Sequence, residues 1–140
     1  MRTTKVKDIM SEVVETLQAG DTLARARRQL ELGGIHHLPV VDADEHVIGL
    51  VTYHRLLEAC IAPEGAGALV PEATAVETIM QKDVLTVDQE TTAAEAARLL
   101  DNNRFGSLPV TKDEKLVGIV TAADFVRVAL RYLEREVHHM

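Results

Sequence analysis

A threonine and an aspartate near the C-terminus have the types and spacing that could bind a ligand. The segment "GIVTAADF", Gly118–Phe125, ends an apolar run at Thr121 and places Asp124 three residues later. A carboxylate can accept hydrogen bonds from both hydroxyls of a ribose diol, while a threonine hydroxyl and nearby backbone N–H groups can hold a phosphate. The same spacing can instead form a capping box, which would only satisfy N–H groups at a helix start.

The segment occurs twice, and its earlier copy carries the opposite charge at the decisive position. In "GLVTYHRL", Gly49–Leu56, Arg55 stands where the later copy has Asp124. A guanidinium only donates hydrogen bonds, so Arg55 cannot accept them from a diol. Arg55 could leave its site empty, could hold a polyphosphate, or could fill the site itself through a salt bridge. A solvated arginine on a helix surface is the remaining interpretation.

Two further motifs repeat in the same order. "VKDIM" at Val6–Met10 returns as "VETIM" at Val76–Met80, and "HLPVVD" at His37–Asp42 returns as "SLPVTK" at Ser107–Lys112. Both pairs are offset by 70 residues, from 76 − 6 and 107 − 37. Self-similarity at a fixed period indicates that one supersecondary unit is built twice.

Each repeat predicts the order strand, helix, strand, strand, helix. Short β-branched runs at Val13–Leu17 and Asp83–Val87 are typical of strands. A helix capped by Asp21 or Thr22 follows the first run, and one capped by Thr92 follows the second.

A hairpin and a second helix complete each repeat. The expected hairpin strands are His37–Val41 with Val47–Thr52, and Leu108–Thr111 with Leu116–Thr121. The second helices begin at Thr52 and Thr121. Pro39 and Pro109 lack an N–H and belong at a strand start or edge. The last helix carries an apolar stripe that we expect to be exposed and to form a dimer interface, namely Phe125, Val128, Ala129, Tyr132 and Leu133.

Composition limits the class of protein. With 140 residues, the two halves are each too small to be stable alone and should form one module. A net charge of -7 argues against a general nucleic-acid binder. Cys60 is the only cysteine, so an intrachain disulfide is impossible. We expect a cytoplasmic location, because the N-terminus has no apolar signal region and no stretch approaches the ~20 residues of a membrane helix.

Taken together, the motifs resemble a tandem pair of CBS domains, also called a Bateman module. The resemblance rests on "DIM", "LPVVD" and "GIVTAADF", and it covers Val6 to about Ala129. It implies an α/β (α+β) fold of two pseudo-symmetric β-α-β-β-α repeats packed through their sheets. We expect repeat 1 in residues 1–62, a linker in residues 63–75 and repeat 2 in residues 76–140.

The resemblance also implies a ligand and its binding residues. Adenosine nucleotides are the usual ligands of CBS pairs, and each site is shared between the repeats. The predicted nucleotide-binding residues are Thr16, Ile35, His36, His37, Pro39, Thr121 and Asp124. A second cleft would be formed by Thr52, Arg55, Thr86, Phe105, Gly106, Ser107 and Pro109.

The expected function is therefore regulatory. The chain would bind AMP, ADP, ATP or S-adenosylmethionine and signal by a conformational or association change, as a homodimer or through an effector protein, with no membrane or nucleic-acid partner. We expect no catalytic residues and no required cofactor. We also expect no metal site, because His36 and His37 are adjacent and neither His46 nor His54 has an evident partner. The alternatives are a structural or protein-interaction module with vestigial clefts and, less favoured, a nucleotide-processing enzyme.

Overall fold

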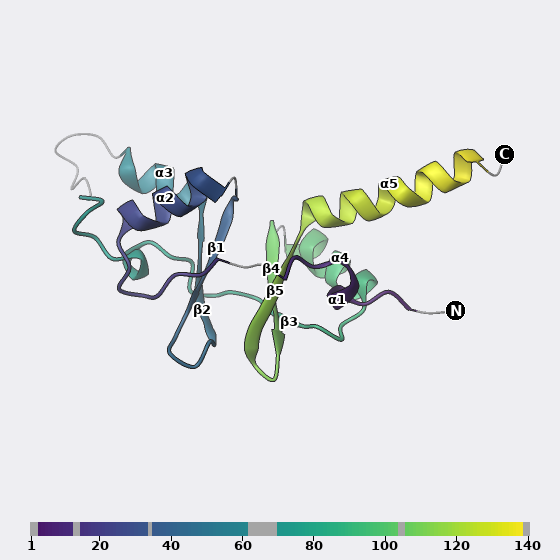
Figure 1. Cartoon of the computed structure of the whole chain (residues 1–140), viewed down its shortest axis with the longest axis horizontal. Helices are drawn as coiled ribbons and strands as arrows, with labels where there is room; N and C mark the ends of the chain where they lie inside the picture. Colours follow the sequence, from purple (N-terminus) through teal and green to yellow (C-terminus); the bar gives the residue numbers. More distant parts are fainter. Residues whose placement is uncertain (1–2, 13–14, 34, 62–69, 104–105, 139–140) are drawn as a thin grey trace. The chain divides into compact units, whose positions relative to one another are not determined.

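The computed structural model describes residues 3–12, 15–33, 35–61, 70–103 and 106–138, without the side chain of His138. Its elements in chain order are α1 (Val6–Ile9), α2 (Leu23–Gly33), β1 (His37–Val41), β2 (Val47–Thr52), α3 (Tyr53–Cys60), the 3-10 helix η1 (Val76–Thr78), β3 (Val87–Asp88), α4 (Ala93–Asn103), β4 (Ser107–Lys112), β5 (Lys115–Thr121) and α5 (Ala122–His138). Figure 1 shows these elements along the chain. The fold is mixed helix and sheet, as predicted, and both repeats are present.

The chain forms two compact units, and each contains residues from both sequence repeats. One unit is residues 14–84, and the other combines residues 1–13 with residues 85–140. The short segment that opens each repeat therefore packs with the hairpin of the other repeat: α1 contacts α4 and β5, while the N–H of Leu50 in β2 donates to Gln81, just after η1. We call residues 4–11 and 74–81 the leading segments.

In the unit of residues 14–84, β1 and β2 form an antiparallel hairpin. The register runs from His37 opposite Thr52 to Val41 opposite Val47, with an irregularity after Val40. Helices α2 and α3 pack beside each other and against the hairpin. The buried core is Leu17, Leu23, Ala26, Leu30, Leu38, Val40, Val51, Leu56, Val76 and Ile79.

The second unit repeats this arrangement. Strands β3, β4 and β5 form one sheet in that order, with β3 parallel and β5 antiparallel to β4. Its buried core is Val6, Val87, Ala96, Leu100, Leu108, Val110 and Val120. Both cores are aliphatic, as the composition requires.

The first strand of each repeat is shorter than predicted. Among the described residues of the run from Val13 to Leu17, only Leu17 pairs, in a parallel bridge with Val40, and Val13 itself lies outside the described residues. The N–H of Leu17 donates to the carbonyl of Pro39 at 2.9 Å. The next bond of such a ladder would need an N–H at residue 39, which proline lacks. Pro109 has the same place beside β3, which is confined to Val87–Asp88.

Threonines begin four helices. The side-chain oxygens of Thr22, Thr52, Thr92 and Thr121 accept from the backbone N–H three residues later, at 3.1, 3.1, 3.2 and 3.3 Å. For α2 this selects Thr22 rather than Asp21, whose carboxylate accepts from the N–H of Gln18 instead. Such caps satisfy N–H groups that have no partner inside the helix.

A methionine in each leading segment explains the repeated glycine of β2 and β5. A Cβ added to Gly118 would lie 2.8 Å from the carbonyl oxygen of Ser11 and would also meet the sulfur of Met10. At Gly49, a Cβ would collide with the side chain of Met80. The methionine of the "DIM" and "TIM" motifs therefore covers a glycine of the other repeat.

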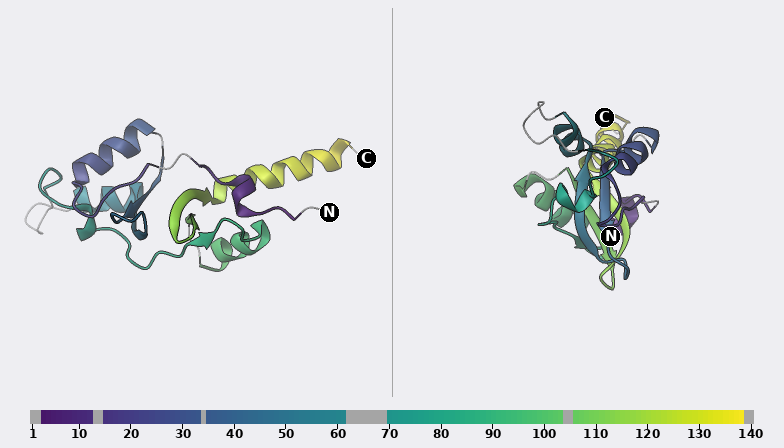
Figure 2. Two further views of the ribbon diagram at one scale, coloured as in Figure 1. Left: turned by 60° about the horizontal axis from the view of Figure 1, so that its bottom comes forward. Right: turned by 90° about the vertical axis from the view of Figure 1, so that its left-hand side faces the viewer.

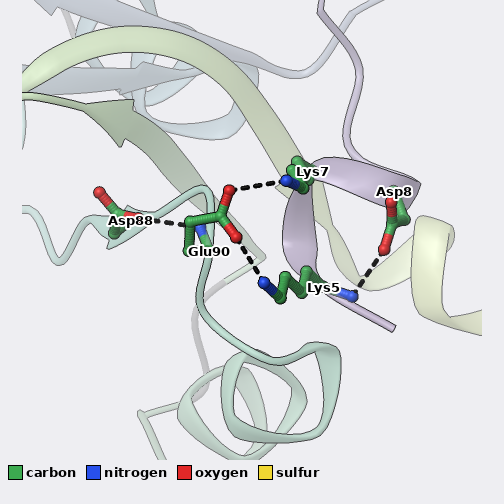
Figure 3. Close-up of polar contacts among 5 residues, drawn as sticks. All are labelled: Lys5, Lys7, Asp8, Asp88 and Glu90. Atoms are coloured by element: carbon green, nitrogen blue, oxygen red, sulfur yellow. Dashed lines mark hydrogen bonds and ion pairs between the residues drawn. The ribbon is translucent and has the colours of Figure 1, made fainter. Parts of the chain in front are cut away.

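Charged side chains also hold α1 to its unit. The Lys5 and Lys7 ammonium groups lie 2.6 and 2.7 Å from the two carboxylate oxygens of Glu90, as Figure 3 shows. The Glu90 carboxylate has a pKa lowered to about 2, first because Lys5 and then because Lys7 donates a hydrogen bond to it.

Helix α5 follows β5 directly and extends well beyond the sheet, as Figures 1 and 2 show. Phe125 packs against the buried core of its unit, whereas residues 131–137 are all exposed. The predicted exposed stripe is therefore wrong at Phe125, because that side chain lies in the first turn, where the helix still faces the core. The exposed large apolar residues of α5 are Val126, Leu130, Tyr132, Leu133 and Val137.

Candidate functional site

Asp124 lies buried in the first turn of α5 and makes three contacts. Its Oδ2 accepts from the backbone N–H of Thr121 at 2.7 Å and from the Thr121 hydroxyl at 3.2 Å. Its Oδ1 accepts from the guanidinium of Arg127. The capping box predicted as one interpretation is therefore formed. A carboxylate offers about four lone-pair sites, so these contacts leave acceptor capacity for a ligand.

Arg127 was not among the predicted site residues. In the sequence, Arg127 lies outside the apolar stripe predicted for the last helix. Its spacing of three residues from Asp124 was the available signal, because residues i and i+3 are neighbours on a helix surface. Arg127 partly neutralises Asp124 and fixes its orientation.

Ser107 and Gly106 lie at the same end of this sheet. Ser107 is paired with Thr121 across β4 and β5, and the carbonyl of Gly106 accepts from the N–H of Ala122. Ser107 is only 4% exposed, and its hydroxyl oxygen finds no hydrogen-bond partner among the described residues. A buried polar group without a partner is costly, which marks this position as one where a ligand or water could bind.

The corresponding end of the other unit holds His36, His37 and Thr52. His37 is paired with Thr52 across β1 and β2, and the carbonyl of His36 accepts from the N–H of Tyr53. The Nδ1 atom of His37 is buried and, within the described part of the chain, has no partner. Burial, and then the charge of His36, lower the pKa of the His37 imidazole. His37 and Ser107 occupy equivalent places in the two repeats.

The remaining predicted residues differ in burial. Pro39 is buried in β1, Ile35 packs against the core of its unit, Thr16 is half-buried beside Leu17, and Thr86 is exposed before β3. Pro109 is buried in β4 opposite Ile119. Phe105 lies outside the described residues.

Arg55 makes a contact within its own unit. Its Nε donates to the carbonyl oxygen of Ile79 in the leading segment, although the side chain is largely exposed. This contact goes to a backbone carbonyl rather than to a carboxylate, and the predicted alternatives for Arg55 stay predictions.

The two repeats reverse the charges at this helix start. Asp124 and Arg127 correspond to Arg55 and Glu58, since 124 − 55 and 127 − 58 are both 69. Glu58 lies 2.8 Å from His54. One helix start therefore presents a carboxylate that accepts hydrogen bonds, and the other presents a guanidinium that donates them.

Thr121 and Asp124 belong to one compact unit, whereas Thr16, Ile35, His36, His37 and Pro39 belong to the other. The second predicted cleft likewise draws on both units. The sharing of each site between the repeats stays a prediction.

Three side chains at the turn of the first hairpin lie together. Ligand atoms of Asp42, Asp44 and His46 are within 4.8 Å of one another. His46 was expected to have no evident partner, but its Nδ1 lies 3.4 Å from Oδ2 of Asp42. The turn itself accounts for the group, since Oδ1 of Asp42 accepts from the N–H groups of Asp44 and His46, both at 2.9 Å. The His46 N–H, before the others, lowers the pKa of Asp42.

A separate pocket of about 250 Å³ lies between α4 and α5, lined by Ala97, Leu100, Asp101, Ala122 and Phe125. None of these residues was predicted to bind a ligand. Among the described helices, none is long and apolar enough to cross a bilayer.

Comparison with known sequences matches the profile of the CBS domain family at residues 6–62 and 76–131. A CBS domain-containing protein of Dictyostelium discoideum is 31% identical over 140 residues, covering 92% of this chain and 93% of that protein. An uncharacterized protein of Methanocaldococcus jannaschii is 33% identical over 135 residues, covering 91% of this chain. This chain spans only 32% of the length of the latter.

Solved structures match over most of the chain. The Vibrio cholerae protein AcuB has a TM-score of 0.82 and 31% identity, covering 98% of both chains. CBSX2, solved in complex with AMP, has a TM-score of 0.80 and 26% identity, covering 91% of this chain and 97% of its own. A CBS domain pair solved with 5′-methylthioadenosine and S-adenosyl-L-methionine has a TM-score of 0.78 and 26% identity, covering 91% and 96%.

Proposed function

Because the chain belongs to the CBS domain family and carries the domain twice in tandem, we propose that it is a regulatory module that senses an adenosine-type ligand. AMP, ADP, ATP and S-adenosylmethionine are the candidate ligands. Relatives solved with AMP and with S-adenosyl-L-methionine support this class.

The arrangement of Thr121 and Asp124 carries the proposal. Asp124 is buried at a helix start, where free N–H groups and the helix dipole favour an anion, and Arg127 holds its carboxylate in one orientation. Its remaining lone pairs would accept from the two ribose hydroxyls. The Thr121 hydroxyl and the first N–H groups of α5 would lie beside a phosphate.

The other repeat would supply the adenine pocket of this site. Backbone groups around His36 and His37 would read the edge of the base, and Ile35 would provide an apolar wall, with Thr16 and Pro39 completing the pocket. Near a phosphate, His37 would make binding depend on pH, although burial lowers the pKa of its imidazole in the free protein.

The second cleft would differ in the ligand that it prefers. Arg55 in place of an aspartate favours a polyphosphate over a ribose diol, and binding would require the guanidinium to leave the carbonyl of Ile79. Thr52, Gly106 and Ser107 would line this cleft, and the partnerless hydroxyl of Ser107 would gain a hydrogen bond there.

The output would pass through association, either as a homodimer or with an effector protein in the cytoplasm. We propose no catalytic role, because the Thr121 hydroxyl, which donates to Asp124, also accepts from the Asp124 N–H and so serves as the helix cap. The alternative is a structural or interaction module whose clefts no longer bind ligands.

A ligand panel tests the proposal. AMP, ADP, ATP and S-adenosylmethionine are titrated separately into the protein by calorimetry, with thermal unfolding measured in parallel. At least one should bind saturably and raise the free energy of unfolding, by about 2.7 kcal/mol at one hundred times its Kd. Binding by none of the four would favour the interaction module. Conversion of ATP to products during incubation would indicate an enzyme.

A further inference from the structure

The pocket between α4 and α5 has one charged side chain in an otherwise apolar lining. Its volume is about 250 Å³, and Asp101 supplies a carboxylate beside the apolar walls of Ala97, Leu100, Ala122 and Phe125. Leu100 is buried, whereas Ala122 and Asp101 are exposed, so the pocket opens to solvent. Within the described part of the chain, the Asp101 carboxylate has no ion-pair or hydrogen-bond partner. It is therefore available to a cation.

The corresponding positions of the first repeat hold an arginine paired with an acid. Ala97 and Asp101 of α4 correspond to Arg27 and Glu31 of α2, since 97 − 27 and 101 − 31 are both 70. There the Nε of Arg27 donates to Oε1 of Glu31 at 3.0 Å. The second repeat keeps the acid but has an alanine in place of the arginine. It therefore lacks a guanidinium that the same fold accommodates in the first repeat.

The wall formed by α5 differs between the repeats in the same sense. Ala122 and Phe125 correspond to Tyr53 and Leu56 of α3, since 122 − 53 and 125 − 56 are both 69. Tyr53 packs against the core of its unit, whereas the second repeat has only a methyl group at this position. Phe125 adds an aromatic ring, and such rings attract guanidinium groups that lie over their faces. The pocket thus combines space, an aromatic ring and a carboxylate.

The size and the single charge of the pocket decide which source of cation fits. Small-molecule sites usually enclose about 300–1,000 Å³, so this pocket suits one side chain better than a nucleotide. Free arginine would also bring an α-carboxylate and an α-ammonium group, for which the lining offers a single carboxylate. Within a protein chain, these two groups are uncharged amides that can remain in water.

We propose that the pocket between α4 and α5 is a docking site for an arginine side chain of a partner protein. The guanidinium pairs with Asp101 and lies against Phe125, and its aliphatic stem covers Ala97 and Ala122. This docking specifies the association with an effector protein proposed above, and it needs no nucleotide.

The compound N-acetylarginine methylamide tests the site, because it carries an arginine side chain between two amides. It is titrated into isotope-labelled protein without nucleotide, and the spectra are followed by NMR. The amide signals of Ala97 and Ala122 should shift saturably, with a Kd on the order of 1 mM for so small a ligand. The uncharged citrulline analogue should bind about threefold more weakly, as expected for an exposed ion pair. No saturable shift at these residues would overturn the proposal.

Two substitutions and a control locate the binding. Asp101→Asn should weaken the arginine compound about threefold and remove its advantage over the citrulline analogue. Glu95→Gln, at an exposed acid of α4 outside the pocket lining, is the matched control and should change neither affinity. Ala97→Arg should fill the pocket from within the chain, as in the first repeat, and abolish binding by the folded protein. Wild-type affinity in Ala97→Arg would overturn the proposal.

Two further comparisons identify the source of the cation. Free arginine should bind no more tightly than the capped compound, and tenfold tighter binding would make the pocket a small-molecule site instead. The titration is repeated at about 20 and 500 µM protein, where an unchanged Kd is expected. Binding that weakens as the protein concentration rises would mean that a second copy of the chain fills the pocket, which would overturn the partner. Failure of every nucleotide to bind would leave this docking site untouched, and failure of the docking would leave the nucleotide proposal untouched.

Discussion

At the scale of single residues, Asp124 shows how one side chain can close a helix and still offer chemistry. The capping box with Thr121 is formed, so capping and ligand binding are not exclusive interpretations of the Thr-x-x-Asp spacing. The partner that the pattern did not suggest is Arg127, which contacts Oδ1 and leaves Oδ2 to the cap.

Asp124→Ala should weaken the binding of AMP or ATP at least about tenfold, because each charge-assisted hydrogen bond contributes about 1.5–3 kcal/mol and every 1.4 kcal/mol is tenfold in affinity. Calorimetric titration with the ligand and its 2′-deoxy analogue measures this. The wild type should prefer the ribose form, and the variant should not distinguish the two.

Asp8→Ala is the matched control for this variant. Asp8 accepts from the N–H of Lys5 at 2.8 Å at the start of α1, which is the same capping role outside the proposed site. Both substitutions should reduce stability, but only Asp124→Ala should change affinity. An unchanged preference for ribose in Asp124→Ala would remove the role given to this carboxylate.

If the second cleft binds a polyphosphate, Arg55→Ala should weaken the binding of ATP more than the binding of AMP. This difference in affinity should shrink at high salt, because charge attraction is screened. Arg55→Lys should keep part of the preference, since it keeps the positive charge. Calorimetry at low and high salt measures both. Arg25→Ala, at an exposed arginine on α2, is the control. Equal losses of affinity for ATP and AMP would mean that Arg55 only contacts the Ile79 carbonyl and does not bind a phosphate.

At the scale of elements, the leading segments matter more than their length suggests. In each leading segment, a methionine covers a glycine in a strand of the other repeat. Each leading segment also contributes a buried valine to the core of the unit that contains this strand. A short motif that looks weak on the sequence is thus fixed by close contacts to residues far along the chain.

Gly118→Ala should lower the free energy of unfolding by about 1–3 kcal/mol, because its Cβ would press on the backbone of Ser11 as well as on Met10. Urea unfolding measures the change. Gly20→Ala is the control, since a Cβ there meets nothing within 4 Å, and it should be neutral or slightly stabilising. A neutral Gly118→Ala would mean that the leading segment does not lie against β5.

The ion pairs of Lys5 and Lys7 with Glu90, drawn in Figure 3, should make the stability of the protein depend on pH. The pKa of Glu90 falls from 4.5 to about 2 on folding, so its contribution is complete above about pH 5 and is lost as the pH falls towards 2. Wild type and Glu90→Gln should therefore differ in stability at neutral pH and converge near pH 2, in urea unfolding at a series of pH values. In a Lys5→Met, Lys7→Met background, the difference should largely disappear at every pH.

At the scale of the whole molecule, the leading segments are exchanged: each packs in the unit that holds the hairpin of the other repeat. Each unit is built from both repeats, so neither repeat holds all the residues of its own core. Removing either leading segment would open the core of the unit that contains the other repeat's hairpin.

Val6→Ala and Val76→Ala should therefore act on opposite repeats. Both valines are fully buried, and each substitution should cost about 1–3 kcal/mol. By hydrogen exchange, Val6→Ala should speed exchange in β4 and β5, and Val76→Ala should do so in β1 and β2. The two variants control for each other, and effects confined to the repeat that carries the substitution would contradict the exchange.

The sequence by itself determined the elements whose signals are local. The strands His37–Val41 and Val47–Thr52 have the predicted bounds, and the helices after Thr52 and Thr121 start where the threonine caps place them. Strand alternation and caps depend on residues within a few positions, so a single sequence carries them. The repeated motifs also predicted the family and the presence of two repeats.

Tertiary structure alone decided which distant groups meet. No local pattern could send Met10 to Gly118 or the Arg55 guanidinium to Ile79, because these contacts join segments 24 to 108 residues apart. A local pattern also could not show that the first strands are short. Their length depends on the partner strand, where Pro39 has no N–H to donate. Phe125 turned inward for the same reason: helical periodicity defines a face, but only the neighbouring sheet decides how far along the helix that face stays covered.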